Sequence, residues 1–461
     1  MALTRIAFAS LGIFSLAACA SITSREEAGA AARASLPDTA EAWAEAQADA
    51  GAVQVGWVDA IGDPVLSSLV REAQANNKDL QAAAANVDRA WALARQAGAA
   101  LEPSVSLTAD ATRGGVLEGS SQAPRGSNVG LALNWELDVW GRIRSGQQAA
   151  AASAEAAEAD YLFSQYSLAA AVARAYFLSI EAGRQVDVAQ KSLDALTETD
   201  RIVRVQYDNG MATSQDVALS RSDLAATRST LAAAQASQRA ALRSLEVLLG
   251  RYPSADVAVE AGLPQTPGLP PAGLPSDMLE RRPDLVSAER QVAASFNSLD
   301  QAKAARLPAI SLTSTIGGAS DQLANTLSPS NLAWTAAGNL VAPLLDGGLR
   351  AAQVDEASAE QRQAIAAYGQ AALNAFEEVE TSLDQNVVLR DREAALREAA
   401  EEVNNALDVA QVRYNEGETD LLDVLIIQQR VFTADSNLVS IERERLDEWV
   451  TLNLALGGSW E

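Results

Sequence analysis

The sequence of 461 residues contains no histidine and a single cysteine, Cys19. Without histidine, the chain lacks the most frequent general base at neutral pH and the most frequent metal ligand. Acidic residues outnumber basic ones by 60 to 35, which gives a formal charge of −25 and argues against the clustered basic surface that nucleic acid binding needs. We therefore expect no catalytic site, no metal site and no nucleic acid partner.

Long hydrophobic runs are also missing beyond the first 18 residues. A membrane-spanning helix needs about 20 predominantly apolar residues, and no later stretch reaches that length. The nucleotide-binding pattern GxxxxGK[ST] is absent as well, so no site for a nucleotide energy source is expected. If the chain spans a membrane, we expect it to do so with strands.

The N-terminus is typical of a bacterial export signal. Arg5 is followed by the short apolar core IAFASLGIFSLAA, and residues 1–18 are predicted to be a signal peptide. The sequence LAAC, which ends at Cys19, resembles a lipobox and predicts a covalent lipid on that cysteine. Ala20 follows it rather than the aspartate of an inner-membrane retention signal, which favours the outer membrane. The alternative is an ordinary signal peptide in which Cys19 is incidental.

The remaining chain contains an internal repeat. YDNGMATSQDV, residues 207–217, is matched by YNEGETDLLDV, residues 414–424, at an offset of about 207 residues. Further pairs keep the same order and nearly the same offset: LEPSVSLT with RLPAISLT, VWGRIR with LDGGLR, and LEVLLG with LNLALG. The segment from Pro253 to Pro275 separates the copies and contains many of the chain's prolines, which predicts an extended linker.

Within each copy the pattern predicts a helix, two strands, a long helix and a return helix. The predicted elements are helix 63–100, strands 105–111 and 128–137 and helices 143–207 and 214–249, then helix 276–306, strands 309–316 and 332–345 and helices 348–414 and 420–456. The predicted division of the chain is 1–18 signal peptide, 19–62 lipid-anchored N-terminal segment and collar, 63–250 first repeat, 251–275 linker, 276–457 second repeat and 458–461 tail.

The predicted strands alternate between apolar and polar residues. Val105 and Leu107 face one way while Ser106 and Thr108 face the other, and the other strands behave alike. Each strand of about 10 residues matches what a tilted strand needs to cross an outer membrane. Four strands cannot close a barrel, because open edges in lipid leave backbone groups unpaired. We expect several chains to share one barrel, or else the strands form a small soluble sheet beneath the helices.

Taken together, these features resemble the outer-membrane efflux factors, the TolC and OprM-like family, in the lipoprotein branch that serves resistance-nodulation-division pumps. The resemblance rests on the lipobox, the duplicated unit, LDVWGR, RRPDL at residues 281–285 and the paired turns. Within RRPDL, Pro283 is expected to open or kink a helix. It implies a mainly α chain with a membrane β-barrel: a homotrimeric 12-stranded outer-membrane barrel continued by a 12-helix periplasmic α-barrel. It also implies a collar, built from the segment before Asp63, the proline-rich linker and the C-terminus. Its expected partners are a periplasmic adaptor and an inner-membrane pump, and its tunnel extends into the periplasm.

The resemblance places the paired turns at the closed periplasmic aperture, which Asp216 and Asp423 narrow. Asp420 makes the second turn more acidic, because it follows Thr419 where some relatives carry an arginine. Like charges in a constriction repel one another and attract cations. The alternative assignment is helix capping alone, since Thr213-x-x-Asp216 and Asp420-x-x-Asp423 both fit a helix start. Closing bonds are expected from the turn tyrosines, and positive φ from the turn glycines, at Tyr207, Tyr414, Gly210 and Gly417.

The predicted function is a passive outer-membrane duct for drugs or metals delivered by an inner-membrane pump and adaptor. The rival is a lipid-anchored periplasmic coiled-coil scaffold without a pore. The rival explains the alanine-rich helices and the lipobox but leaves the two pairs of membrane-length strands unexplained. The cargo and the partner pump are not named by the sequence.

Overall fold

The structure is a computed structural model that describes residues 25–36, 43–44, 53, 55–114 and 125–460. The chain divides into two compact units, each built from discontinuous segments. Unit 1 comprises residues 1–37, 85–159 and 286–371, and unit 2 comprises residues 38–84, 160–285 and 372–461. Unit 1 holds the strands, and unit 2 holds both turns between the long helices and their return helices.

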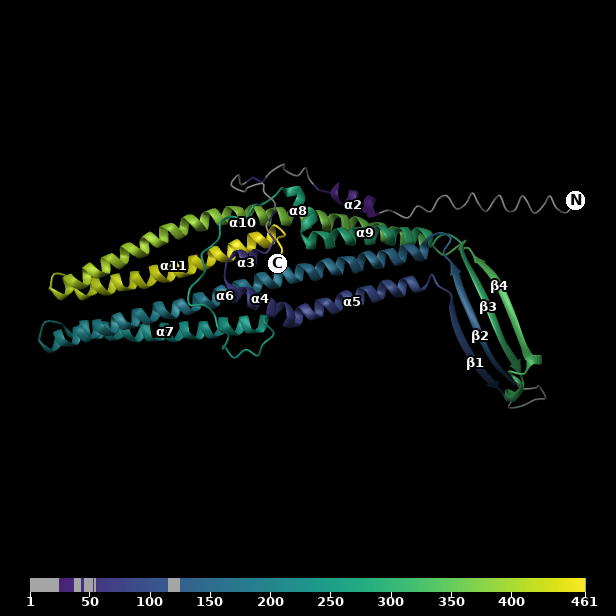
Figure 1. The fold of residues 1–461 in the computed structure, drawn as a ribbon, viewed down its shortest axis with the longest axis horizontal. Coiled ribbons are helices and arrows are strands. Elements are labelled where there is room, and N and C mark those ends of the chain that lie inside the picture. The colour runs from purple at the N-terminus through teal and green to yellow at the C-terminus, as the bar shows by residue number, and fades with distance from the viewer. Residues whose placement is uncertain (1–24, 37–42, 45–52, 54, 115–124, 461) are drawn as a thin grey trace. The chain divides into compact units, whose positions relative to one another are not determined.

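A four-stranded antiparallel sheet belongs to unit 1. Its strands run in the order β1 (Ser104–Arg113), β2 (Arg125–Leu137), β3 (Ala309–Ser320) and β4 (Leu332–Val341). The first pair comes from one repeat and the second pair from the other, and the two repeats meet where β2 pairs with β3. Strands β1 and β4 form the edges, and every residue along both is exposed. The sheet is therefore open at both sides within the described chain (Figure 1).

The register separates the two faces of the sheet as the alternation predicts. Leu107 lies opposite Leu131, which lies opposite Ile316, and Ile316 lies opposite Trp334. Residues paired across strands share a face, so these side chains form one apolar band across the sheet. The other face carries mostly small and polar residues, among them Ser106, Thr108, Asp110, Asn128, Asn134, Thr313, Thr315, Thr335 and Asn339.

Each repeat contains one very long helix and one return helix. In the first repeat they are α6 (Arg142–Asp208) and α7 (Ser214–Leu248), and in the second α10 (Leu349–Asn415) and α11 (Leu421–Ala455). Both long helices have 67 residues, and both return helices have 35. At 1.5 Å per residue each long helix measures about 100 Å. Alanine, the best helix former, is abundant in α6, α7 and α10, and its small side chain allows close packing. Among the described helices none is long and apolar enough to cross a membrane.

The shorter helix of each repeat is interrupted, which the sequence prediction missed in the first repeat. Helices α4 (Pro64–Asn76) and α5 (Lys78–Ala99) are separated at Asn77, whose backbone is extended. Its side chain accepts from Leu80 N at 3.0 Å, which caps α5. Helices α8 (Pro275–Arg281) and α9 (Pro283–Ala304) are separated at Arg282, because a residue before proline avoids the helical conformation.

A further described helix of unit 1 was not predicted. Helix α2 (Arg25–Arg33) buries Ala28 against Ala152 and Ala293, and Ala32 against Val292 and Tyr368. The small alanine side chains of α2 permit this close packing. The helix has nine residues, shorter than the window of about 11 to 18 residues over which helical periodicity is recognised, so its pattern was not identified.

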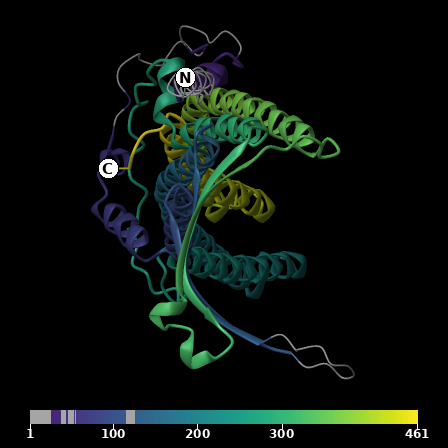
Figure 2. The same cartoon turned by 90° about the vertical axis from the view of Figure 1, so that its right-hand side faces the viewer.

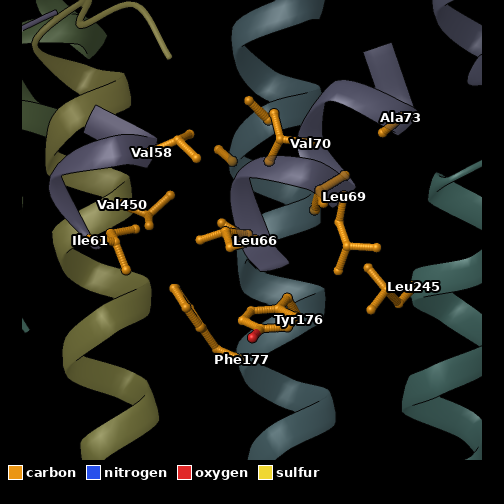
Figure 3. Packing of buried hydrophobic residues seen from close by; sticks show 14 of the residues in the cluster. Val58, Ile61, Leu66, Leu69, Val70, Ala73, Tyr176, Phe177, Leu245 and Val450 are labelled. Carbon is orange, nitrogen blue, oxygen red and sulfur yellow. The ribbon is translucent and has the colours of Figure 1, made fainter. Parts of the chain in front are cut away.

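The largest hydrophobic cluster lies in unit 2, where α3 (Trp57–Ala60) and α4 pack on α6, α7 and α11 (Figure 3). Tyr176 and Phe177 are fully buried there. The Tyr176 hydroxyl donates to Asp63 Oδ2 at 2.7 Å, while Asp63 Oδ1 caps α4. Burial, reinforced by the Asp63 carboxylate, raises the pKa of Tyr176 far above its ordinary value.

The linker, the chain before Asp63 and the C-terminal residues come together in unit 2. Trp449 donates to the Gly268 carbonyl at 3.0 Å, and Trp43 donates to the Gly273 carbonyl at 3.1 Å. Gly56 N donates to the Ser459 carbonyl at 3.1 Å. These are the three segments from which the family resemblance builds a collar.

Charged side chains are enclosed between α6 and α11 of unit 2. Arg443 pairs with Glu181 on α6 and with Asp447 on its own helix. Burial raises the pKa of the Asp447 carboxyl to about 6, against the opposing pull of Arg443 and Arg174. The motif RRPDL is anchored in a similar way, because buried Arg282 pairs with Asp284 at 2.7 Å and with Glu378 at 2.6 Å.

Candidate functional site

The two turns between long and return helices have the same backbone geometry. Gly210 has φ of +77° and Gly417 has φ of +79°. In the first turn Met211 N donates to the Gln206 carbonyl and Gly210 N to the Tyr207 carbonyl, at 2.8 and 2.9 Å. The second turn repeats both bonds, which form a Schellman motif. Both glycines therefore take the left-handed conformation that ends each long helix.

Asp216 caps the helix that follows the first turn. Thr213 N and Thr213 Oγ1 both donate to Asp216 Oδ2 at 2.8 Å, and Asp216 N donates to Thr213 Oγ1 at 3.2 Å. These bonds form a complete capping box at the start of α7. The capping geometry expected from the sequence is thus present, and the carboxylate remains half-exposed.

The second turn differs from the expected cap. Asp420 occupies the N-cap position of α11, but its side chain makes no capping bond. Instead, the Thr419 hydroxyl donates to Asp423 Oδ2 at 2.7 Å. The prediction that Asp420 and Asp423 repeat the first capping box is wrong, because the Asp423 carboxylate accepts its hydrogen bond from Thr419 and not from Asp420. Asp420 and Asp423 are both exposed.

Tyr414 joins the second turn to the first helical hairpin. Its hydroxyl donates to Gln206 Oε1 at 2.7 Å, so the end of α10 is held to the end of α6. Burial raises the pKa of Tyr414, and the nearby Asp216 carboxylate raises it further. Tyr207, the counterpart of Tyr414 in the repeat, is 47% exposed, and its hydroxyl has no hydrogen bond within the described chain. The two repeats thus place equivalent tyrosines in different environments.

A small hydrophobic core lies next to the two turns. Leu196 and Val203 of α6, Leu224 of α7, and Leu421 and Leu425 of α11 are buried together, with Tyr414 against them. These contacts fix the spacing of the turns within unit 2.

Buried polar bonds accompany this core. Gln428 of α11 donates to Thr199 Oγ1 of α6 at 3.0 Å, and Ser220 of α7 donates to Asp200 Oδ1 of α6 at 2.9 Å. These four residues and Gln206 were not predicted from the sequence. Four of them lie in the polar and alanine-rich helices α6 and α7, where nothing in the local pattern distinguishes a buried polar residue from an exposed one.

The turn region carries an excess of carboxylates. Asp208, Asp216, Glu416, Glu418, Asp420 and Asp423 lie in or next to the two turns. Arg413, at the end of α10, lies beside them and pairs with Glu418 at 3.5 Å. Closely spaced carboxylates of this kind attract cations and repel anions. The predicted lipidation residue, Cys19, lies outside the described residues.

Comparison with known proteins establishes the class of this chain. Its sequence matches the family described as outer membrane efflux protein over residues 69–251 and again over residues 274–458. The chain therefore belongs to the outer membrane efflux protein family. The two matched ranges together account for most of the chain, and each ends beside the glycine that follows a return helix.

The curated relatives are named for several exported substances. The chain is 31% identical over 420 residues to the pyoverdine export outer membrane protein OpmQ of Pseudomonas aeruginosa, covering 88% of this chain and 87% of that protein. It is 30% identical over 409 residues to the cation efflux system protein CusC of Escherichia coli, covering 88% of each.

Solved structures show the same fold. The outer-membrane channel OprN matches with a TM-score of 0.83 and 29% identity, over 92% of this chain and 98% of that one. A CusC structure matches with a TM-score of 0.81 and 28% identity, over 92% of this chain and 99% of that one. The predictions of an outer-membrane efflux fold, with a β-barrel continued by a helical tunnel, and of an outer-membrane channel function are confirmed.

Proposed function

We propose that this channel protein works as a homotrimer in which three copies close one barrel, and that it is a passive exit duct. The observation that carries the proposal is the open sheet, with β1 and β4 exposed along their whole length. In lipid these edges would leave backbone donors and acceptors unpaired at a cost of several kcal/mol each. Pairing β1 with β4 of the next copy removes that cost. The duct itself performs no catalytic step.

The lining of the duct follows from the two faces of the sheet. The apolar band of Leu107, Leu131, Ile316 and Trp334 faces lipid, and the small polar face lines the interior. Short hydroxyl and amide side chains leave a wide interior with little selectivity. This suits small cargo of varied chemistry, and the names of OpmQ and CusC, which refer to pyoverdine and to cations, support a small-molecule or metal cargo.

The two turns form the periplasmic aperture in this proposal. Asp216 and Asp423 from each of three copies, with Asp420 beside them, gather carboxylates near one axis. The Tyr414 bond to Gln206 holds the two hairpins of one copy together. Tyr207 is 47% exposed, and in this proposal it contacts the neighbouring copy. Asp216 serves both as a cap and as part of the aperture.

Energy comes from an inner-membrane pump through a periplasmic adaptor. One support is the sequence, which lacks a GxxxxGK[ST] motif. Another is the name of a relative 29% identical over 414 residues, the probable efflux pump outer membrane protein TtgC of Pseudomonas putida. A lipid on Cys19 anchors the chain to the outer membrane.

Planar-bilayer conductance of the purified protein tests the duct. We expect discrete conductance steps from the native chain. Asp216→Ala combined with Asp423→Ala is expected to enlarge the resting conductance or weaken its preference for cations. A bilayer that stays sealed would favour the scaffold without a pore. Discrete steps that are identical in the native and doubly substituted chains would reject the assignment of Asp216 and Asp423 to the aperture. They would leave the duct itself supported.

A further inference from the structure

The connection between β3 and β4 is a folded segment rather than an extended loop. It contains two short 3-10 helices, η1 (Leu323–Asn325) and η2 (Pro329–Asn331). Asn331 Nδ2 donates to the Asn325 carbonyl at 2.8 Å, and Ser328 N donates to the same carbonyl at 3.0 Å. Thr326, at the centre of the segment, is only 1% exposed. We refer to residues 321–331 as the β3–β4 segment.

This segment is seated on the sheet at Gly318. A Cβ atom added to Gly318 would lie 1.8 Å from the Thr326 carbonyl oxygen and 3.4 Å from that of Asn331. The backbone of the segment therefore occupies the space that any larger residue at position 318 would need. The Thr326 hydroxyl also contacts the hydroxyl of Ser127 on β2, and Ser127 is buried. Figure 2 shows the segment, in green, beside the curved sheet.

Both contacts lie on the apolar face. Gly318 pairs with Val129 on one side and Leu332 on the other, so it shares their face. Ser127 stands two residues before Val129 on the same strand and also faces that way. The register is unbroken along these strands, so no bulge reverses the faces. The segment therefore covers the outer, lipid-facing side of the sheet rather than the interior face.

Two leucines of the segment are exposed. Leu323 is 72% exposed and Leu327 is 62% exposed. They lie at the same end of the sheet as Trp334, which belongs to the apolar band and is 74% exposed. Exposing two leucines to water in so short a polar segment is unfavourable, at about 25 cal/mol for each Å² of apolar surface. Lipid next to the apolar band removes that cost.

We propose that the β3–β4 segment is a lipid-contacting anchor at the outer rim of the barrel, with Leu323 and Leu327 inserted at the boundary between headgroups and acyl chains. This inference rests on the proposed function, because it takes the sheet as one part of a membrane barrel. The occupant is lipid because the leucines continue the apolar band that already faces lipid. The segment consequently lies outside the exit path and does not cover the mouth of the duct.

Site-specific fluorescence in lipid vesicles tests the anchor. Leu323→Cys and Leu327→Cys are each labelled with the environment-sensitive dye NBD, in full-length protein reconstituted into phosphatidylcholine vesicles. Ser330→Cys, an exposed polar position of the same segment, is the matched control, and the unsubstituted chain measures any labelling at Cys19. We expect blue-shifted emission and quenching by doxyl-labelled lipid at 323 and 327. The control is expected to be quenched mainly by aqueous iodide.

The seat at Gly318 provides a second variant. Gly318→Ala is expected to displace the segment and abolish the lipid quenching at position 327. Gly338→Ala is the matched control, because its Cβ would lie on the same face of the sheet and meet only Leu312 Cδ2, at 3.8 Å. It is expected to leave the quenching unchanged.

The outcomes separate the anchor from the duct. Iodide quenching at 323 and 327 equal to that at 330, in protein that still conducts, would overturn the anchor and leave the duct intact. Protection from both iodide and doxyl lipid would place the leucines against protein and would also overturn the anchor. A protein that never conducts would overturn the duct on which the anchor rests.

Discussion

The two roles of Asp216 can be separated by two substitutions in one capping box. Asp216→Asn removes the charge but keeps an oxygen that can accept from Thr213 N and Thr213 Oγ1, as Asp216 Oδ2 does at 2.8 Å. Thr213→Ala removes the hydroxyl and its bonds but keeps the carboxylate. If Asp216 serves both as a cap and in the aperture, the two variants change different properties: the first changes cation preference, and the second changes the stability of the helix start.

The magnitudes follow from the bonds that each variant loses. Losing the threonine cap costs about 1 kcal/mol, which raises the population of a frayed first turn of α7 roughly fivefold. Losing the carboxylate removes about 1 kcal/mol of attraction for a cation at 4 Å in water, again roughly a fivefold effect. The charge effect is screened, because the Debye length falls from about 10 Å at 0.1 M salt to about 3 Å at 1 M.

Reversal potentials across a salt gradient measure cation preference in planar bilayers. Asp216→Asn is expected to lower the preference at low salt, with the difference fading at high salt. Thr213→Ala is expected to leave the preference intact and to increase hydrogen exchange at the start of α7. Asp223→Asn, about two helical turns further along α7, controls for charge outside the turn. If Asp216→Asn matches this control, the carboxylate acts as a cap alone.

Three further variants test the supporting contacts. Arg282→Met leaves two carboxylates without their buried partner and is expected to lower the free energy of unfolding by about 3–5 kcal/mol, measured with denaturant. The control is Arg251→Met, at a half-exposed ion pair, which is expected to cost about 1 kcal/mol or less. Equal costs would contradict the ion-pair assignment. Tyr414→Phe removes the bond to Gln206, costs about 1 kcal/mol and is expected to speed amide exchange at the second turn, whereas Tyr207→Phe is expected to change little. Burial raises the pKa of Asp447 from 3.8 to about 6, so the folded state holds this proton more tightly, and stability is lost as the pH rises from about 3.8 to about 6. Asp447→Asn is expected to flatten that part of the urea midpoint profile, and an unchanged profile would contradict it.

The sequence was most informative where local chemistry decides the structure. Alternation in the strands predicted both faces of the sheet, and Gly210 and Gly417 predicted the ends of the long helices, because positive φ favours glycine. Pro283 predicted an opening or kink of the α9 helix for a similarly local reason. The duplicated order of landmarks predicted the order of elements in both repeats.

The sequence was least informative where distant contacts decide. The break at Asn77 depends on the Leu248 carbonyl, which accepts from Asn77 Nδ2 at 3.0 Å. The bond from Tyr414 to Gln206 joins residues far apart in the chain. At the second turn two capping-type residues are adjacent, and only the position of the helix start decides that Thr419 reaches Asp423. Periodicity carries no information about such pairings.

The number of chains in one barrel is the most direct test of the account. Native mass spectrometry of the mature, full-length protein released from detergent micelles measures it without a substitution or a partner. Three copies closing their open sheets predict a dominant trimer that survives detergent removal in the gas phase. A population made up of monomers would contradict the shared barrel, because a single four-stranded sheet leaves both of its edges unpaired.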